Sequence, residues 1–139
     1  IYSKKLLLLV ERYRLNKKLI FIENCAEMPV AYKLADVALS SSIEPEAFGR
    51  VAVEAQAMNT PIIASNLGGS KETVLNGKSG LLFMSKDAQD LARNINKLME
   101  MSKESLRLMG EDGRKNVEKK FNVDQMCQTT FTEYEKLIK

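Results

Sequence analysis

The chain contains no histidine and no tryptophan among its 139 residues. Without histidine it can form neither a Ser-His-Asp triad nor a Cys-His nucleophile pair, and it lacks the most common transition-metal ligand. Its only cysteines, Cys25 and Cys127, lie far apart and form no Cys-x-x-Cys motif, so the sequence predicts neither a zinc site nor a redox motif. Any chemistry must therefore rest on carboxylates, amides, basic side chains or the backbone, and we expect a reducing compartment.

Aromatic residues and net charge are also low, with four Tyr, five Phe and a formal charge of +3. The basic residues are spread along the chain, whereas a nucleic-acid binder needs a concentrated basic face with interleaved aromatics. The apolar run from Leu6 to Val10 is too short to span a membrane and lacks a signal-peptide cleavage pattern. We therefore expect a cytoplasmic protein with no nucleic-acid partner and no targeting segment.

Short apolar segments alternate along the chain with segments of helical pattern. The predicted strands are Leu19–Ile22, Val37–Ser40, Ile62–Ala64 and Gly80–Phe83. The predicted helices are 2–15, which we expect to pack one face on the sheet, a helix beginning near Pro29, and then 48–58, 71–75, 87–101, 103–119 and 123–139. Strands this short and apolar are typical of a parallel sheet covered on both faces. The sequence thus predicts one α/β domain over residues 1–139, Rossmann-like and doubly wound, in which residues 120–139 form a C-terminal helix.

In such sheets ligands bind beyond the carboxyl ends of the strands. In this chain those ends lead into Asn24-Cys25, Ser40–Gly49 and Ser65–Gly69. All three loops are therefore expected to open on one edge of the sheet.

Two glutamates separated by seven residues, Glu46 and Glu54, are the most informative feature of the sequence. Glu54 lies in a helix that is otherwise almost wholly apolar, so its carboxylate either faces water at the mouth of a cleft or accepts hydrogen bonds from hydroxyl or amide donors. Between the two glutamates, the backbone N–H groups of Phe48, Gly49 and Arg50 are the free donors of a helix start, which favours an anion. A ligand with sugar, diphosphate and ribose in a row fits this arrangement.

Each of these features also has a simpler interpretation. Taken alone, Glu54 is a solvated helix residue, and Glu46 complements the dipole of the helix. The side chain of Arg50 is expected to be exposed, which leaves its backbone N–H as the better candidate for ligand contact. Gly68-Gly69 is expected to be a backbone turn, because no phosphate-loop pattern surrounds it.

Several blocks of sequence in a fixed order carry a resemblance to a known family. They are ADVALSSS (35–42), PEAFGRVAVEA (45–55), PIIAS (61–65), GGSKETV (68–74) and GKSG (77–80). The chain resembles the retaining glycosyltransferases of family 4, which have the two-domain GT-B architecture and a Glu-seven residues-Glu motif in the C-terminal domain. The resemblance is close from Leu19 to Phe83, and the flanking helical segments match only in pattern.

The resemblance implies a role for each candidate residue. Glu46 is the catalytic candidate and contacts the donor sugar, whereas Glu54 accepts hydrogen bonds from the ribose hydroxyls. The remaining donor-binding residues act mostly through the backbone: Asn24 and Cys25 on the base, and Phe48, Gly49, Arg50 and Val51 on the diphosphate and sugar. The resemblance implies that neither a cofactor nor a metal is needed. It also implies that catalysis relies mainly on electrostatic stabilisation of the leaving diphosphate.

The resemblance also implies what surrounds this segment. We expect the chain to begin downstream of a first strand and helix, which in the family carry an Arg and a Lys that bind the diphosphate. We also expect its partner to be an N-terminal acceptor domain that this sequence does not include. Asn59 stands where the family has glycine. The full-length enzyme would transfer a hexose in polysaccharide or lipopolysaccharide biosynthesis, in the cytoplasm or peripherally at the inner face of the membrane.

Two other interpretations stay open. In the first, the chain is a truncated product that folds, at most binds nucleotide and catalyses nothing. A dinucleotide-binding domain of an oxidoreductase is disfavoured, because the glycine fingerprint is missing. The choice among UDP, GDP and ADP, the sugar and the acceptor also stay open. Apolar surface left where a missing partner packs predicts self-association.

Overall fold

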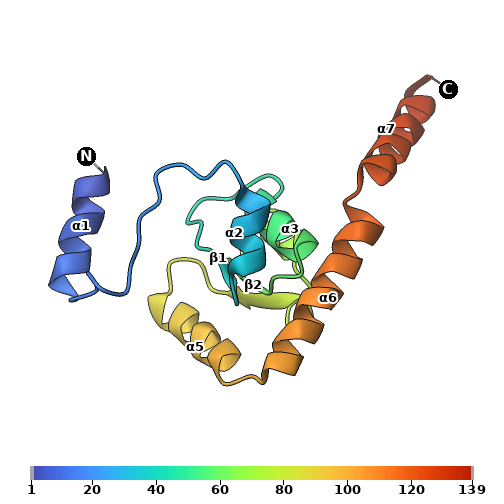
Figure 1. The fold of residues 1–139 in the computed structure, drawn as a ribbon. Helices are drawn as coiled ribbons and strands as arrows, with labels where there is room; N and C mark the ends of the chain where they lie inside the picture. Colours follow the sequence, from blue (N-terminus) through green and yellow to red (C-terminus); the bar gives the residue numbers. More distant parts are fainter. Residues whose placement is uncertain (1, 139) are drawn as a thin grey trace.

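A three-stranded parallel sheet forms the centre of the computed structural model, which describes residues 2–138 (Figure 1). The strands are β1 (Ala38–Ser40), β2 (Ile62–Ser65) and β3 (Gly80–Phe83), in the order β1-β2-β3. The helices are α1 (Tyr2–Arg12), α2 (Met28–Leu34), α3 (Arg50–Ala57), α4 (Ser70–Thr73), α5 (Ala88–Met99), α6 (Lys103–Lys120) and α7 (Val123–Ile138). Within residues 2–138, no helix combines the length and the apolar character that crossing a bilayer requires. Ile1 and Lys139, which the sequence assigns to the domain and to its flanking helices, lie outside the described residues.

The sheet is covered on both faces because its strands are apolar on both sides. Ile62 and Ala64 of β2 belong to a buried cluster with α3, whereas Ile63 between them belongs to a second cluster with α5 and α6. Successive side chains of a strand point to opposite faces, so a wholly buried strand needs a helical layer on each side. The predicted α/β architecture with helices on both faces is confirmed.

Helix α3, which carries Glu54, is fixed at its end and along its buried face. Asn59, the residue after the C-cap Met58, has a φ of 62°, a left-handed conformation that asparagine tolerates at the end of a helix. The fully buried Gln56 donates through Nε2 to the carbonyls of Ala52 and Thr73, at 3.0 Å each, and Asn116 of α6 donates to the same Thr73 carbonyl. These bonds join α3, α4 and α6 beneath the site.

The prediction of a strand at Leu19–Ile22 is wrong. The segment is irregular, and all four of its side chains are exposed, Ile20 by 86%. A strand needs a neighbour for its backbone N–H and C=O groups, and in the described chain β1 pairs on one side only, with β2. With no strand beside it, the apolar segment runs across the gap between α1 and α2 (Figure 1).

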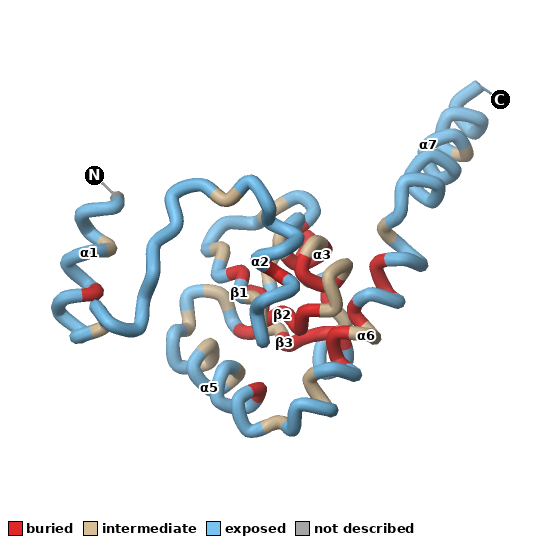
Figure 2. Tube along the Cα trace, viewed as in Figure 1, coloured by how far each residue is buried: buried red, intermediate tan, exposed pale blue. Residues whose placement is uncertain are grey.

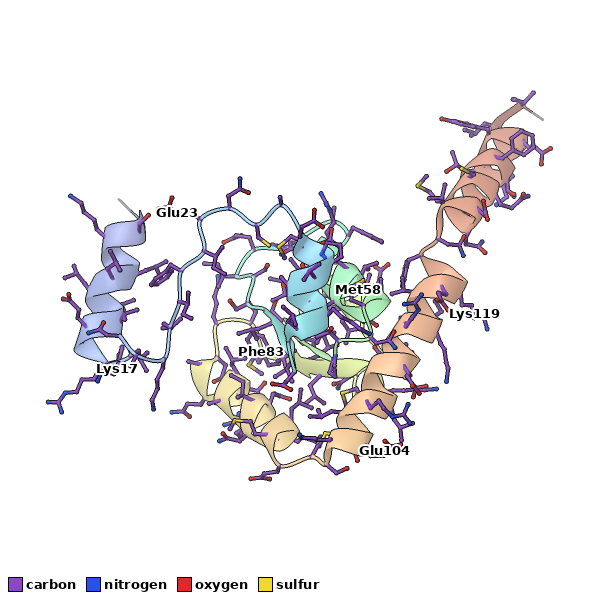
Figure 3. The ribbon with its side chains drawn as sticks, in the orientation of Figure 1. Lys17, Glu23, Met58, Phe83, Glu104 and Lys119 are labelled. Carbon is purple, nitrogen blue, oxygen red and sulfur yellow. The ribbon has the colours of Figure 1, made fainter. Side chains whose placement is uncertain are left out.

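The expectation that the first helix packs on the sheet is also wrong. Helix α1 ends at Arg12 and lies apart from the sheet, and its Leu8 is 65% exposed. Figure 2 shows the buried residues gathered around the sheet and α3, with α1 and α7 almost wholly exposed. Figure 3 shows the same contrast, with Lys17 and Glu23 on the α1 side and Met58 and Phe83 in the centre of the molecule.

Candidate functional site

The loops that leave β1 and β2 at their carboxyl ends pack against each other. The N–H of Gly69 donates to the carbonyl of Glu46 at 2.7 Å. A Cβ added to Gly68 would lie 2.4 Å from the carbonyl oxygen of Glu46, and one added to Gly69 would lie 2.5 Å from the carbonyl carbon of Phe48. Gly68 and Gly69 therefore let the two loops pack backbone against backbone. A side chain at either position would clash with the backbone of Glu46 or Phe48.

The loop passes into α3 through Gly49, which has a φ of +76° and caps the helix. The N–H groups of Ala52 and Val53 donate to the Gly49 carbonyl, at 3.0 and 3.3 Å. The amides of Gly49, Arg50 and Val51 therefore precede the first bonded donors of α3 and are the free donors of the helix start. The sequence placed this start at Phe48, and the structure moves it two residues along the chain, to Arg50.

Glu54 lies one turn inside α3 and has two partners. Arg50 donates to its Oε1 from Nη2 at 2.9 Å and from Nε at 3.2 Å, while the hydroxyl of Tyr32 donates to its Oε2 at 3.2 Å. The Glu54 side chain is 38% exposed. Both conditions that the sequence offered as alternatives are met, because the carboxylate reaches the surface and also accepts a hydroxyl hydrogen bond. Burial, and then the charge of Glu54, raise the pKa of the Tyr32 phenol.

An open cavity of about 380 Å³ adjoins Glu54 between α2 and α3. Its lining is mostly apolar apart from the Tyr32, Arg50 and Glu54 side chains. The other lining residues are Met28, Pro29, Ala57 and Met58. Asn24 and Cys25, the residues proposed to read the base, precede α2 in an irregular segment and do not line this cavity.

Glu46 is half-buried in the loop before α3 and accepts a hydrogen bond from the hydroxyl of Ser42. The Ser42 carbonyl in turn accepts a hydrogen bond from the hydroxyl of Ser85, at 3.3 Å. The sequence analysis missed Ser42, Ser85 and Tyr32. The run of serines that ends β1 was a signal for Ser42, whereas nothing in the sequence marks Ser85 or Tyr32.

In chain order, the site thus has one carboxylate before and one after a run of free amides. Such a surface accepts hydrogen bonds from hydroxyls at its two ends and donates to an anion between them. Phe48 lies beside the amides, its ring edge-on to that of Phe121 with centroids 5.7 Å apart. Among residues 2–138, no group of three or more His, Cys, Asp or Glu side chains is placed to hold a metal ion.

Comparisons with known proteins show the family of the chain. The model of the family described as glycosyl transferases group 1 matches residues 2–116. The capsular polysaccharide biosynthesis glycosyltransferase CapM of Staphylococcus aureus is 38% identical over 95 residues, which are 68% of this chain and 24% of that protein.

Solved structures resemble the chain over almost its whole length. Sucrose-phosphate synthase of Thermosynechococcus elongatus has a TM-score of 0.87 at 32% identity, covering 97% of this chain and 34% of that one. Anabaena HepE in complex with UDP-glucose has a TM-score of 0.89 at 27% identity, covering 97% and 37%. The chain therefore spans between about a quarter and just over a third of the length of these relatives. Its fold is that of the C-terminal part of a GT-B glycosyltransferase, and the chain belongs to the family of glycosyl transferases group 1.

Proposed function

We propose that this chain is the donor-binding part of a retaining glycosyltransferase of family 4 and holds a nucleotide diphosphate sugar at the start of α3. The observation that carries the proposal is the row of free amides at Gly49–Val51 with Glu46 on one side and Glu54 on the other. The structural neighbour HepE is described in complex with UDP-glucose, a ligand with sugar, diphosphate and ribose in this order.

In this proposal each part of the ligand meets the chemistry that suits it. The diphosphate accepts hydrogen bonds from the amides of Gly49, Arg50 and Val51, where the helix dipole also favours negative charge. Glu54 accepts hydrogen bonds from the ribose hydroxyls, and Glu46 does the same for hydroxyls of the sugar. The open cavity beside Glu54 leaves space next to the proposed ribose position.

The proposed reaction breaks the bond between the anomeric carbon and the diphosphate oxygen and forms a bond from that carbon to the oxygen of an acceptor hydroxyl, whose proton passes to the leaving diphosphate. Negative charge grows on the diphosphate as it leaves, and the α3 amides stabilise it without moving, because they are fixed by the helix. Glu46 lies at the sugar end and is the proposed catalytic residue. No histidine is needed for these steps.

The first test is a calorimetric titration of the 139-residue chain with UDP, GDP and ADP. We expect saturable binding of one nucleotide, weakened about tenfold by Glu54→Gln, which removes a charged acceptor while keeping the size of the side chain. Glu100→Gln, on the exposed C-cap of α5, is the matched control and should leave the affinity unchanged. No binding of any of the three nucleotides overturns the proposal.

The same titration tests the proposal that no metal is required. The affinity should be equal in EDTA and in excess Mg²⁺, because the amides rather than a cation neutralise the diphosphate. A strong dependence on Mg²⁺ would contradict this part of the proposal.

For the whole protein we propose transfer of a hexose onto a cell-envelope glycan, at the inner face of the membrane or in the cytoplasm. The support is the relative CapM, which is named for capsular polysaccharide biosynthesis. Incorporation of labelled sugar into envelope glycans, compared between cells with and without the gene, tests this proposal.

A further inference from the structure

Glu54 is held by two side chains of opposite character, one buried and one exposed. From this arrangement we infer that Tyr32 is a positioning residue, which fixes the Glu54 carboxylate so that its Oε1 atom is presented to the ribose of a bound nucleotide. The inference rests on the proposed function and adds to it a residue from outside the glutamate motif.

Tyr32 is anchored at both its backbone and its ring. It is only 7% exposed and packs in the core cluster with Ala52 and Ala55 of α3. Its carbonyl accepts a hydrogen bond of 2.7 Å from the hydroxyl of Thr60, which lies between α3 and β2. Close packing therefore holds the ring on its core side, and the hydroxyl reaches Glu54 Oε2 at the edge of the open cavity.

Arg50, the other partner of Glu54, is free to leave. Its side chain is 83% exposed, and an exposed ion pair four residues apart on a helix contributes little to stability. It bonds Oε1 alone, the oxygen that Tyr32 does not contact. A ligand hydroxyl can therefore replace Arg50 at Oε1 while Tyr32 keeps its hold on Oε2.

Holding Oε2 of Glu54 in place is expected to raise the affinity for a nucleotide. A glutamate side chain loses rotamer freedom when it orders around a ligand, and this loss weakens the affinity. If Tyr32 has already ordered the carboxylate in the free protein, the ligand no longer bears that cost. Tyr32 can act in this way without touching the ligand.

The test uses Tyr32→Phe, which removes the hydroxyl and keeps the ring in the core. Affinities are measured by calorimetry for UDP and for its dideoxyribose analogue, which lacks the ribose hydroxyls. We expect the variant to weaken UDP binding roughly three- to tenfold, the effect of one hydrogen bond, and to leave binding of the analogue unchanged. Tyr13→Phe, at an exposed tyrosine outside the site, is the control and should affect neither ligand.

Equal weakening for UDP and the analogue would overturn the inference, because a merely structural role of Tyr32 does not depend on the ribose hydroxyls. Unchanged affinity for UDP would overturn it as well. Failure of the unmodified chain to bind UDP, GDP or ADP would instead overturn the proposed function.

A second measurement examines the contact without any nucleotide. Since the chain has no tryptophan, ultraviolet absorbance follows tyrosine ionisation directly, and the difference between the unmodified chain and Tyr32→Phe isolates Tyr32. Glu54→Gln should make Tyr32 ionise at lower pH, because it removes the negative charge that opposes ionisation. No change would show that the hydrogen bond is absent and would overturn the inference on its own.

Discussion

Two glycines hold the loop that carries Glu46 against the end of the sheet, and a third glycine provides a contrast. Gly69 has an ordinary φ of −62°, but its Cβ position is filled by the backbone of Phe48. Gly77 has a φ of +80°, and nothing lies within 4 Å of its Cβ position. A side chain is therefore excluded by contact at Gly69 and by backbone conformation at Gly77.

Gly69→Ala should push the Glu46–Phe48 loop out of place, lowering the free energy of unfolding by about 1–3 kcal/mol and the affinity for UDP about tenfold. Gly77→Ala should lower stability by a similar amount, roughly 1–2 kcal/mol, because alanine is strained in the left-handed region. It should leave the affinity unchanged. Denaturant unfolding and calorimetry measure the two quantities, and equal losses of affinity in both variants would contradict the role assigned to Gly69.

Tyr32 also predicts a pH dependence of stability. Burial, together with the charge and hydrogen bond of Glu54, raises the pKa of Tyr32 above its ordinary value of 10.0, and only Arg50 opposes this effect. A raised pKa in the folded state gives stability that is present below the unfolded pKa and lost as the pH rises through the folded one. As the pH rises above about 10, stability should therefore fall more steeply in the unmodified chain than in Tyr32→Phe. Denaturant titrations at a series of pH values measure this, and an equal fall in the free energy of unfolding in both proteins would contradict the prediction.

The sequence left open whether Glu54 faces water or accepts a hydrogen bond, and it did not identify the donor. Tyr32 lies 22 residues earlier, on a different helix, and only the packing of α2 on α3 brings its hydroxyl to the carboxylate. Ser42 was closer to prediction, since it lies four residues before Glu46 in the same loop. Hydrogen bonds across elements depend on helix positions that the local pattern does not specify.

Among the elements, β3 was predicted with its observed bounds, whereas Leu19–Ile22 was not a strand at all. Both are apolar runs of four residues, so the local pattern does not separate them. Gly80–Phe83 lies beside β2 and pairs with it, and its first residue must be glycine because a Cβ would lie 2.2 Å from the Ile62 carbonyl oxygen. Whether an apolar run becomes a strand depends on its neighbour in space.

Helix α5, which covers one face of the sheet, depends on its N-cap. The Asp87 side chain accepts hydrogen bonds of 2.9 Å from the amides of Gln89 and Asp90. Asp87→Ala should destabilise the protein by about 1 kcal/mol, whereas Asp87→Asn keeps an accepting oxygen and should cost much less. Denaturant unfolding of the two variants measures this difference, and equal destabilisation would show that the cap bonds contribute nothing.

At the scale of the whole molecule, apolar side chains are exposed on both arms that extend from the core. Leu7, Leu8 and the Leu19–Ile22 segment are exposed at one end of the chain, and Phe131, Tyr134 and Leu137 at the other. A soluble monomer rarely leaves so much apolar surface uncovered. These exposed side chains give the predicted self-association a structural basis. The sequence analysis had instead placed Leu19–Ile22 in the sheet.

Light scattering of the isolated chain should show a mass that rises with concentration. Replacing Ile20 and Ile22 together with lysine should reduce this association, since it removes apolar surface and adds repulsion. Ser3→Lys with Asn16→Lys adds the same charge without removing apolar side chains and should have a smaller effect. A monodisperse monomer at all concentrations would contradict the prediction.

The ion pair between Arg50 and Glu54 joins the carboxylate proposed to bind the ribose to the helix start proposed to bind the diphosphate. A ribose hydroxyl that takes Oε1 releases a guanidinium within one turn of the amides proposed to hold the diphosphate. Uridine and pyrophosphate, added as separate molecules, should therefore bind with positive cooperativity, each raising the affinity of the other by the same factor. Calorimetric titration of uridine with and without saturating pyrophosphate measures this factor, and Arg50→Gln should reduce it to one.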